Sequence, residues 1–99
     1  MSGARVALGT VEIHLPDVGS LKGKRHALKG LKQKLRQRFE ISVAEVDHQD
    51  QWQRSAIGVA AVSGTAGHLQ DVLDSVERFV DRAPDVEVLE VETTFMESE

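Results

Sequence analysis

Apolar and polar residues alternate along four segments of the chain, as they do in strands that face a core on one side. In residues 5–15, Thr10, Glu12 and His14 interleave with Val, Ile and Leu, which predicts the first strand. The same reasoning predicts three further strands, at residues 40–47, 54–62 and 86–95. The polar residues 48–53 would connect the second strand to the third, and residues 96–99 are expected to fray.

Two other segments repeat their apolar residues at helical spacing. The first helix is predicted over residues 21–39, after Ser20, which is a good N-terminal cap. Its apolar positions are Leu21, Leu28, Leu31, Leu35 and Phe39. The second helix follows a turn in which Thr65 can act as the cap, and it ends before Pro84. Its apolar positions are Leu69, Val72, Leu73, Val76, Phe79, Val80 and Ala83.

The predicted elements follow one another as β-α-β-β-α-β within 99 residues, which suits a single domain spanning residues 1–99. Right-handed crossovers turn this order into an α+β ferredoxin-like βαββαβ plait, with a four-stranded antiparallel sheet and both helices on one face. The usual arrangement places the first and third strands in the centre. Both strands suit that place because each carries apolar residues on both of its faces.

The first strand offers Val6 and Leu8 on one face and Ala7, Val11, Ile13 and Leu15 on the other, and two helices can cover only one face of the sheet. An uncovered apolar face usually marks an interface or a ligand site. We therefore expect a second copy of the chain on this face, in a homodimer. The alternative is that the Ala, Gly and Thr residues of these strands leave the outer face polar enough to stay in solvent.

Charge is distributed unevenly along the chain, whose formal net charge is −4. Residues 22–38 carry eight basic side chains and no acidic one, whereas the remaining residues carry four basic and sixteen acidic side chains. At about 100° per residue, five of the eight lie within about 80° of one another on the predicted helix. These five residues, here called the basic stripe, are Lys22, Arg25, Lys29, Lys32 and Arg36. The other three, on the opposite flank, are Lys24, Lys34 and Arg38.

The basic stripe predicts contact with a polyanion, and the phosphates of RNA are the candidate. Stacking of bases on the sheet is not expected, because that mode needs exposed aromatic residues on the central strands and neither strand has one. The alternative is a solvated or dimer-facing helix whose charge is balanced by acidic side chains of the chain. The candidates for that balance are Asp71, Asp74, Asp81 and Glu87.

A polar cluster surrounds the connection after the second strand, and it contains Asp47, His48, Asp50, Trp52 and Arg54. Asp47 and His48 could supply metal ligands, but neighbouring residues of a strand point to opposite faces unless the loop turns them. We therefore predict loop structure or a partner contact rather than a metal site, with Arg54 paired to Asp47 or Glu45. Asp50 is expected to cap a turn, and Trp52 is the best candidate for an interface anchor.

No sequence pattern indicates catalysis or a cofactor. The chain has no cysteine, its four histidines lack the spacing of metal-binding pairs, and its serines lie outside known nucleophile motifs. No apolar run approaches the roughly 18 residues that span a bilayer. Residues 1–5 lack the pattern of a signal peptide, so the cytoplasm is the expected location.

Two segments resemble the YlxP-like family of bacterial proteins, a family of unknown function. They are Ser20-Leu-Lys-Gly-Lys-Arg25 and Val43-Ala-Glu-Val-Asp-His-Gln-Asp50 followed by Trp52-Gln-Arg54. The resemblance runs from about Val6 to Val91 and implies a small, cytoplasmic, ferredoxin-like protein. Genes of this family are often found near those of transcription and translation-initiation factors, which implies a role around RNA or ribosomes by association. The resemblance implies no catalytic residues.

The resulting prediction is a non-enzymatic accessory protein that is associated with RNA or the ribosome through its basic stripe. The alternative is a structural or regulatory homo-oligomer that packs through its sheet face and encloses a small-molecule ligand.

Overall fold

Six elements follow one another in the computed structural model, which describes residues 3–98. They are β1 (Arg5–His14), α1 (Leu21–Arg38), β2 (Ser42–Asp47), β3 (Arg54–Ser63), α2 (Ala66–Asp81) and β4 (Glu87–Glu97). Met1, Ser2 and Glu99 lie outside the described residues. The predictions of a frayed end and of no signal peptide therefore fall partly outside them. Neither helix is long and apolar enough to cross a membrane.

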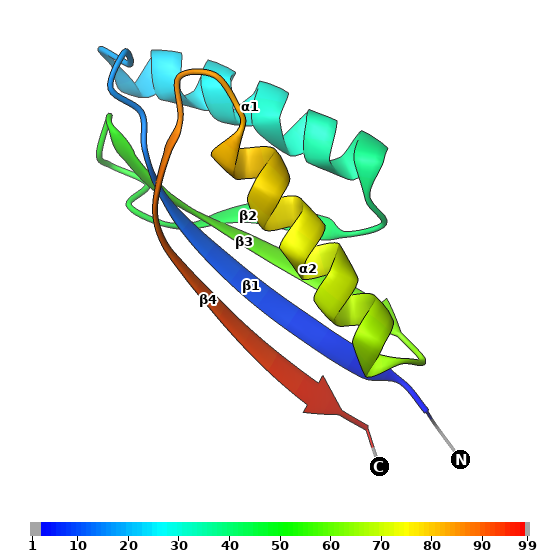
Figure 1. Ribbon diagram of the computed structural model, residues 1–99. Helices are drawn as coiled ribbons and strands as arrows, with labels where there is room; N and C mark the ends of the chain where they lie inside the picture. Colours follow the sequence, from blue (N-terminus) through cyan, green and yellow to red (C-terminus); the bar gives the residue numbers. More distant parts are fainter. Residues whose placement is uncertain (1–2, 99) are drawn as a thin grey trace.

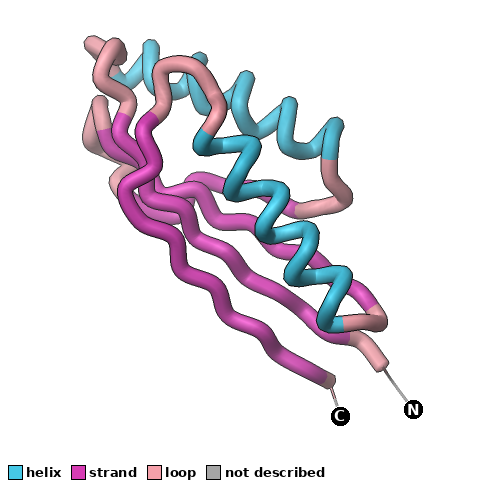
Figure 2. Tube along the Cα trace, in the orientation of Figure 1, coloured by secondary structure: helices cyan, strands magenta, loops and turns pink. Residues whose placement is uncertain are grey.

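The strands form one antiparallel sheet in the order β2-β3-β1-β4. Both helices cover the same face of this sheet (Figure 1), so the molecule has two layers (Figure 2). The fold is therefore the predicted ferredoxin-like α+β plait, with β1 and β3 in the centre.

The core lies between the helices and the inner face of the sheet. Alternate residues of β1, such as Val11 and Ile13, are buried there, and β1 pairs with β3 so that Val11 lies opposite Ile57. The helices contribute their apolar stripes, which are Leu28, Leu31 and Leu35 from α1 and Leu69, Leu73, Val76 and Val80 from α2. Gly9 lets α2 approach β1 closely, because a Cβ atom at this position would lie 3.0 Å from Val59 Cγ2 and 3.4 Å from Leu73 Cδ2.

The ends of several elements differ from the sequence prediction. β4 continues to Glu97, whose carboxylate pairs with Arg5 Nε at 3.0 Å, so the expected fraying of residues 96 and 97 is wrong. The predicted cap at Ser20 is confirmed, because its hydroxyl accepts a hydrogen bond from the Gly23 backbone at 2.9 Å. Thr65 occupies the corresponding position of α2, but its side chain makes no capping bond.

The outer face of the sheet has an apolar end and an acidic end. At the apolar end, Leu8, Val62 and Met96 are 41%, 69% and 47% exposed, which confirms the predicted exposed apolar surface there. At the acidic end, Glu12 lies opposite Glu90 on the neighbouring strand. That arrangement of like charges weakens the pairing of the two strands. The uncovered apolar surface therefore occupies only part of the outer face.

Candidate nucleic-acid interface

The basic stripe lies on the solvent side of α1. Lys22, Arg25, Lys29 and Arg36 are exposed and Lys32 is half-buried, whereas the leucines of the same helix face the core. Arg36 fixes the position of the stripe, because its Nη2 donates a hydrogen bond to the backbone carbonyl of Val43 at 2.8 Å. Val43 belongs to β2, an edge strand, so the stripe follows one edge of the sheet.

The charge of the basic stripe is not balanced by ion pairs within residues 3–98. No salt bridge among these residues includes a stripe side chain. Of the acidic residues proposed as partners, Glu87 instead lies 3.5 Å from His14 Nδ1, and Asp71, Asp74 and Asp81 form no ion pair with the stripe. The stripe is therefore a surface of unpaired cations, which attracts polyanions.

Lys24 does not belong to this surface, although it lies within the basic segment. Its residue exposure is only 1%, and its Nζ lies 2.9 Å from a carboxylate oxygen of Glu45. The same Nζ donates to the carbonyl oxygens of His48 at 2.7 Å, Gln49 at 3.3 Å and Arg54 at 3.3 Å. Its placement on an opposite basic flank is therefore wrong, because Lys24 joins α1 to the connection between β2 and β3.

The connection between β2 and β3 turns sharply at His48, whose φ is 62°. The turn brings His48 Nε2 to 2.9 Å from one carboxylate oxygen of Glu12, while Arg54 Nη2 lies 3.1 Å from the other. The predicted pairing of Arg54 with Asp47 or Glu45 is therefore wrong. The hydrogen bond from His48 is the main reason that the pKa of Glu12 lies below its ordinary value, and the nearby Arg54 acts in the same direction.

The same turn brings together a possible set of metal ligands. One ligand atom each from Glu12, Asp47 and His48 lie within 4.8 Å of one another, although adjacent strand residues were expected to diverge. Both Glu12 oxygens already contact His48 or Arg54, and Asp47 Oδ1 accepts the His48 backbone N–H at 2.7 Å. A guanidinium in contact with the carboxylate also opposes a bound cation. The arrangement fits an ion-pair network that braces the loop better than a metal centre.

The remaining residues of the polar cluster, Asp50 and Trp52, take no part in the salt bridges found among residues 3–98. Asp50 is exposed, and Trp52 is 54% exposed beside it. A large aromatic side chain in contact with solvent is a common anchor of protein interfaces. Trp52 therefore stays a candidate for a partner contact.

The chain is similar to known proteins over most of its length. It is 35% identical over 82 residues to "Uncharacterized protein YlxP" of Bacillus subtilis (strain 168), which covers 83% of this chain and 89% of that protein. Among solved structures it is similar to "De novo designed protein Foldit4", at a TM-score of 0.55 and 10% identity, over 96% of this chain and 99% of the other. That second likeness concerns the fold alone. Residues 6–93 match a family profile, and the chain therefore belongs to the family described as "Protein of unknown function (DUF503)".

Proposed function

We propose that this chain is a non-enzymatic, cytoplasmic accessory protein that binds RNA, free or on the ribosome, through the basic stripe of α1. The observation that carries the proposal is the set of five cations on one side of a helix, without ion pairs among residues 3–98. Each cation that contacts a phosphate releases bound counterions, which makes such binding favourable and sensitive to salt.

The binding mode follows from the side chains that α1 and the sheet present. From Lys22 to Arg36 the helix rises about 21 Å, which is long enough for several phosphates along one strand. Central strands β1 and β3 carry no Phe, Tyr or Trp, so the outer face lacks the aromatic residues on which an RNA-recognition sheet stacks bases. Contacts with phosphates position an RNA but do not read its sequence. The protein therefore recognises the backbone or shape of a structured RNA.

The test compares two triple variants with the same change in charge. In the first, Lys22, Arg25 and Lys29 are replaced by Glu. In the matched control, Lys34, Arg78 and Arg82 are replaced by Glu, which leaves the basic stripe intact. Binding to a ribosomal RNA hairpin is measured by fluorescence anisotropy over a series of salt concentrations, and RNA cross-linked in cells is recovered and sequenced.

The stripe variant is expected to lose binding, and any residual slope of log K against log salt should be shallower by about 2 to 3 units, at about 0.7–0.9 per lost phosphate contact. The control variant is expected to keep both the affinity and the slope within about twofold, since it changes none of the proposed phosphate contacts. Equal loss in the two variants would mean that net charge rather than the stripe governs binding. Unchanged affinity in the stripe variant would reject the proposal.

A second candidate function is a structural or regulatory homodimer that packs through the apolar end of the outer sheet face. It is favoured by the exposure of Leu8, Val62 and Met96 on one continuous side of β3, β1 and β4. Light scattering should then report a dimer, and Val62→Arg should convert it to a monomer. The triple Glu variant of the basic stripe should remain dimeric. A wild-type monomer at high concentration would exclude this candidate.

A further inference from the structure

A groove of about 740 Å³ lies between α1 and the C-terminal half of α2. Its floor is apolar, formed by side chains that include Leu31, Phe39 and Phe79. Phe39 and Phe79 meet edge to face, with their ring centroids 6.2 Å apart, which is a favourable geometry for an aromatic pair. None of the five stripe residues lines the groove, which is therefore a second surface on the opposite flank of α1.

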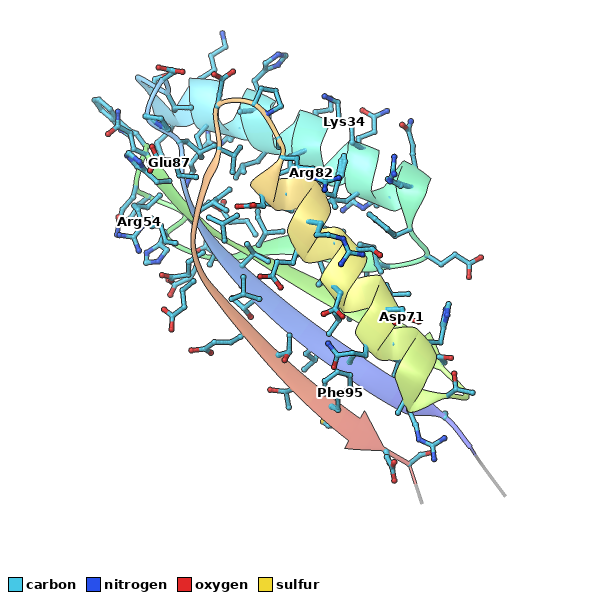
Figure 3. The ribbon with its side chains drawn as sticks, in the orientation of Figure 1. Lys34, Arg54, Asp71, Arg82, Glu87 and Phe95 are labelled. Atoms are coloured by element: carbon cyan, nitrogen blue, oxygen red, sulfur yellow. The ribbon has the colours of Figure 1, made fainter. Side chains whose placement is uncertain are left out.

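Four cations and two carboxylates line this groove, the carboxylates being those of Asp17 and Asp85. Lys34 and Arg38 come from α1, and Arg78 and Arg82 come from the end of α2. Figure 3 labels one residue from each wall, Lys34 and Arg82. The other charged side chains of α2 are all acidic, and none of them lines the groove: Asp71, Asp74, Glu77 and Asp81. Charge on α2 is thus sorted so that its basic residues face the groove.

Neither Asp17 nor Asp85 forms a salt bridge with these four cations, so the lining keeps an excess of positive charge. No salt bridge among residues 3–98 includes any of the four. Arg38 instead lies over the ring of Phe79, with its guanidinium carbon 5.6 Å from the centroid, and Arg78 donates to the hydroxyl of Ser75 at 3.2 Å. Basic residues at helix C-termini also stabilise the helix dipole, which accounts for Arg38 and Arg78 by place alone. It does not explain why cations from two helices line the same apolar groove.

The side of the groove that α1 forms carries two small residues, Ala27 and Gly30, which lie about one turn apart. A Cβ atom built at Gly30 would meet no atom within 4 Å. Glycine inside a helix costs about 1 kcal/mol relative to alanine, and here it leaves the groove open. Two helices pack at about 8–10 Å between their axes, so small residues at the contact allow a close approach.

We propose that this groove binds an acidic amphipathic α-helix of a partner protein. Its apolar side would rest on Leu31, Phe39 and Phe79, and its carboxylates would meet the cations of the two walls. The stretch of α1 that lines the groove, from His26 to Arg38, rises about 18 Å, which matches about 12 residues of a docked helix. The proposal does not rest on RNA binding, because the two surfaces share no residue.

The experiment uses the full chain and a fluorescein-labelled 14-residue peptide with Leu at positions i, i+3, i+4 and i+7 and Glu on both flanks. Two control peptides accompany it, one with the same composition in scrambled order and one with every Glu replaced by Lys. Only the first peptide is expected to bind. Its NMR shift changes should centre on Lys34, Phe79 and Arg82, and leave Lys22 and Arg25 unmoved.

Two matched variants test whether the peptide binds in the groove. Gly30→Trp fills the groove and should abolish peptide binding, whereas Gly67→Trp adds the same side chain at an open position of α2 outside the groove and should leave binding unchanged. Because Gly30→Trp could also disturb α1, the double variant Arg78→Glu with Arg82→Glu provides an independent check. Both arginines are exposed and form no salt bridge within residues 3–98, so their replacement should not unfold the chain. Affinity of the double variant for the acidic peptide should fall at least tenfold.

Three results would overturn the proposal. Equal binding of the scrambled peptide would mean that the surface binds acidic peptides without selecting an amphipathic helix. Displacement of the bound peptide by an RNA hairpin would make the groove part of the RNA surface. Binding of palmitate in the groove, with no binding of the acidic peptide, would assign it to a small anionic amphiphile instead.

Discussion

Lys24 is the side chain on which the local structure depends most. Its buried ammonium holds the carboxylate of Glu45 and three backbone carbonyls in place. Lys24→Met removes that cation and leaves Glu45 in a poorly solvated position, where among residues 3–98 only the hydroxyl of Ser55 donates to it, at 2.7 Å. Loss of one partner of a buried ion pair destabilises a protein by about 3–5 kcal/mol, and urea unfolding should show a loss of this size.

Replacement of both Lys24 and Glu45 separates the contribution of charge to stability from that of packing. In the double variant Lys24→Met with Glu45→Met no buried charge is left unpaired, so its free energy of unfolding should exceed that of Lys24→Met alone. Recovery should be partial, because the carbonyls of Gln49 and Arg54 still lose the hydrogen bonds that Lys24 donates, while the carbonyl of His48 keeps only the bond from the Gln51 N–H among residues 3–98. A double variant that is less stable than the single one would show that the pair contributes through packing rather than through charge.

Glu12 gives the molecule a specific pH dependence. Its pKa is lowered in the folded state, chiefly by the hydrogen bond from His48, so its ionised form stabilises the fold above the ordinary pKa of a glutamate. That contribution is lost as the pH falls through the lowered pKa, from about 5 downwards. Glu12→Gln should therefore lose less stability than the wild type over this range in urea unfolding. Glu92→Gln, at a position that makes no bond to His48 or Arg54 within residues 3–98, should behave as the wild type does.

The partners of these side chains could be read from the sequence only in part. Lys24 stands three residues after Leu21 and four before Leu28, so its spacing already placed it on the apolar side of α1. The partner of Arg54 depends on strand register, which the sequence does not reveal. Ala56 lies opposite Glu12, and Arg54 is two residues away on the same face, within reach as a diagonal neighbour.

The starts of the two helices differ in a way that mutation can measure. Ser20 makes a side-chain capping bond and Thr65 does not, although both occupy the N-cap position. Ser20→Ala should lower the free energy of unfolding by about 1 kcal/mol, while Thr65→Ala should change it much less. Urea unfolding of the two variants gives the comparison. Equal losses of stability in the two variants would mean that the capping bond of Ser20 does not stabilise α1.

The order of elements was predictable because apolar spacing distinguishes strands from helices so clearly in this chain. The ends of the elements were harder to predict than their order, as β4 shows. The strand was predicted to end at residue 95, and Met96 and Glu97 extend it because they pair with Val6 and Arg5 of β1. Register shifts in β2 and β4 depend in the same way on contacts between distant residues. The sequence predicted the basic stripe, which lies on one helix, but not the groove, which needs two.

The basic stripe and a pair of exposed glutamates lie at opposite edges of the sheet. The basic stripe follows the β2 edge, while Glu90 and Glu92 lie on β4 at the far edge, three strand spacings of about 4.8 Å away. That separation exceeds the Debye length of about 8 Å at 0.15 M salt. Lysine at both positions raises the formal net charge from −4 to 0, since each change adds two charges. RNA affinity at 0.15 M salt should nevertheless stay within about twofold in anisotropy measurements. A tenfold gain would show that the total charge, rather than the stripe, controls binding.

Pairing of the first strand with the last has a consequence for the nascent chain. β1 is central in the sheet, yet one of its two neighbours is β4, which is synthesised only at residues 87–97. Until those residues leave the exit tunnel of the ribosome, one edge of β1 has no partner strand. An unpaired edge of a strand rich in Val, Ile and Leu makes the nascent chain prone to aggregation. Translation that stalls before residue 87 would therefore release a chain whose central strand β1 lacks one of its two neighbours.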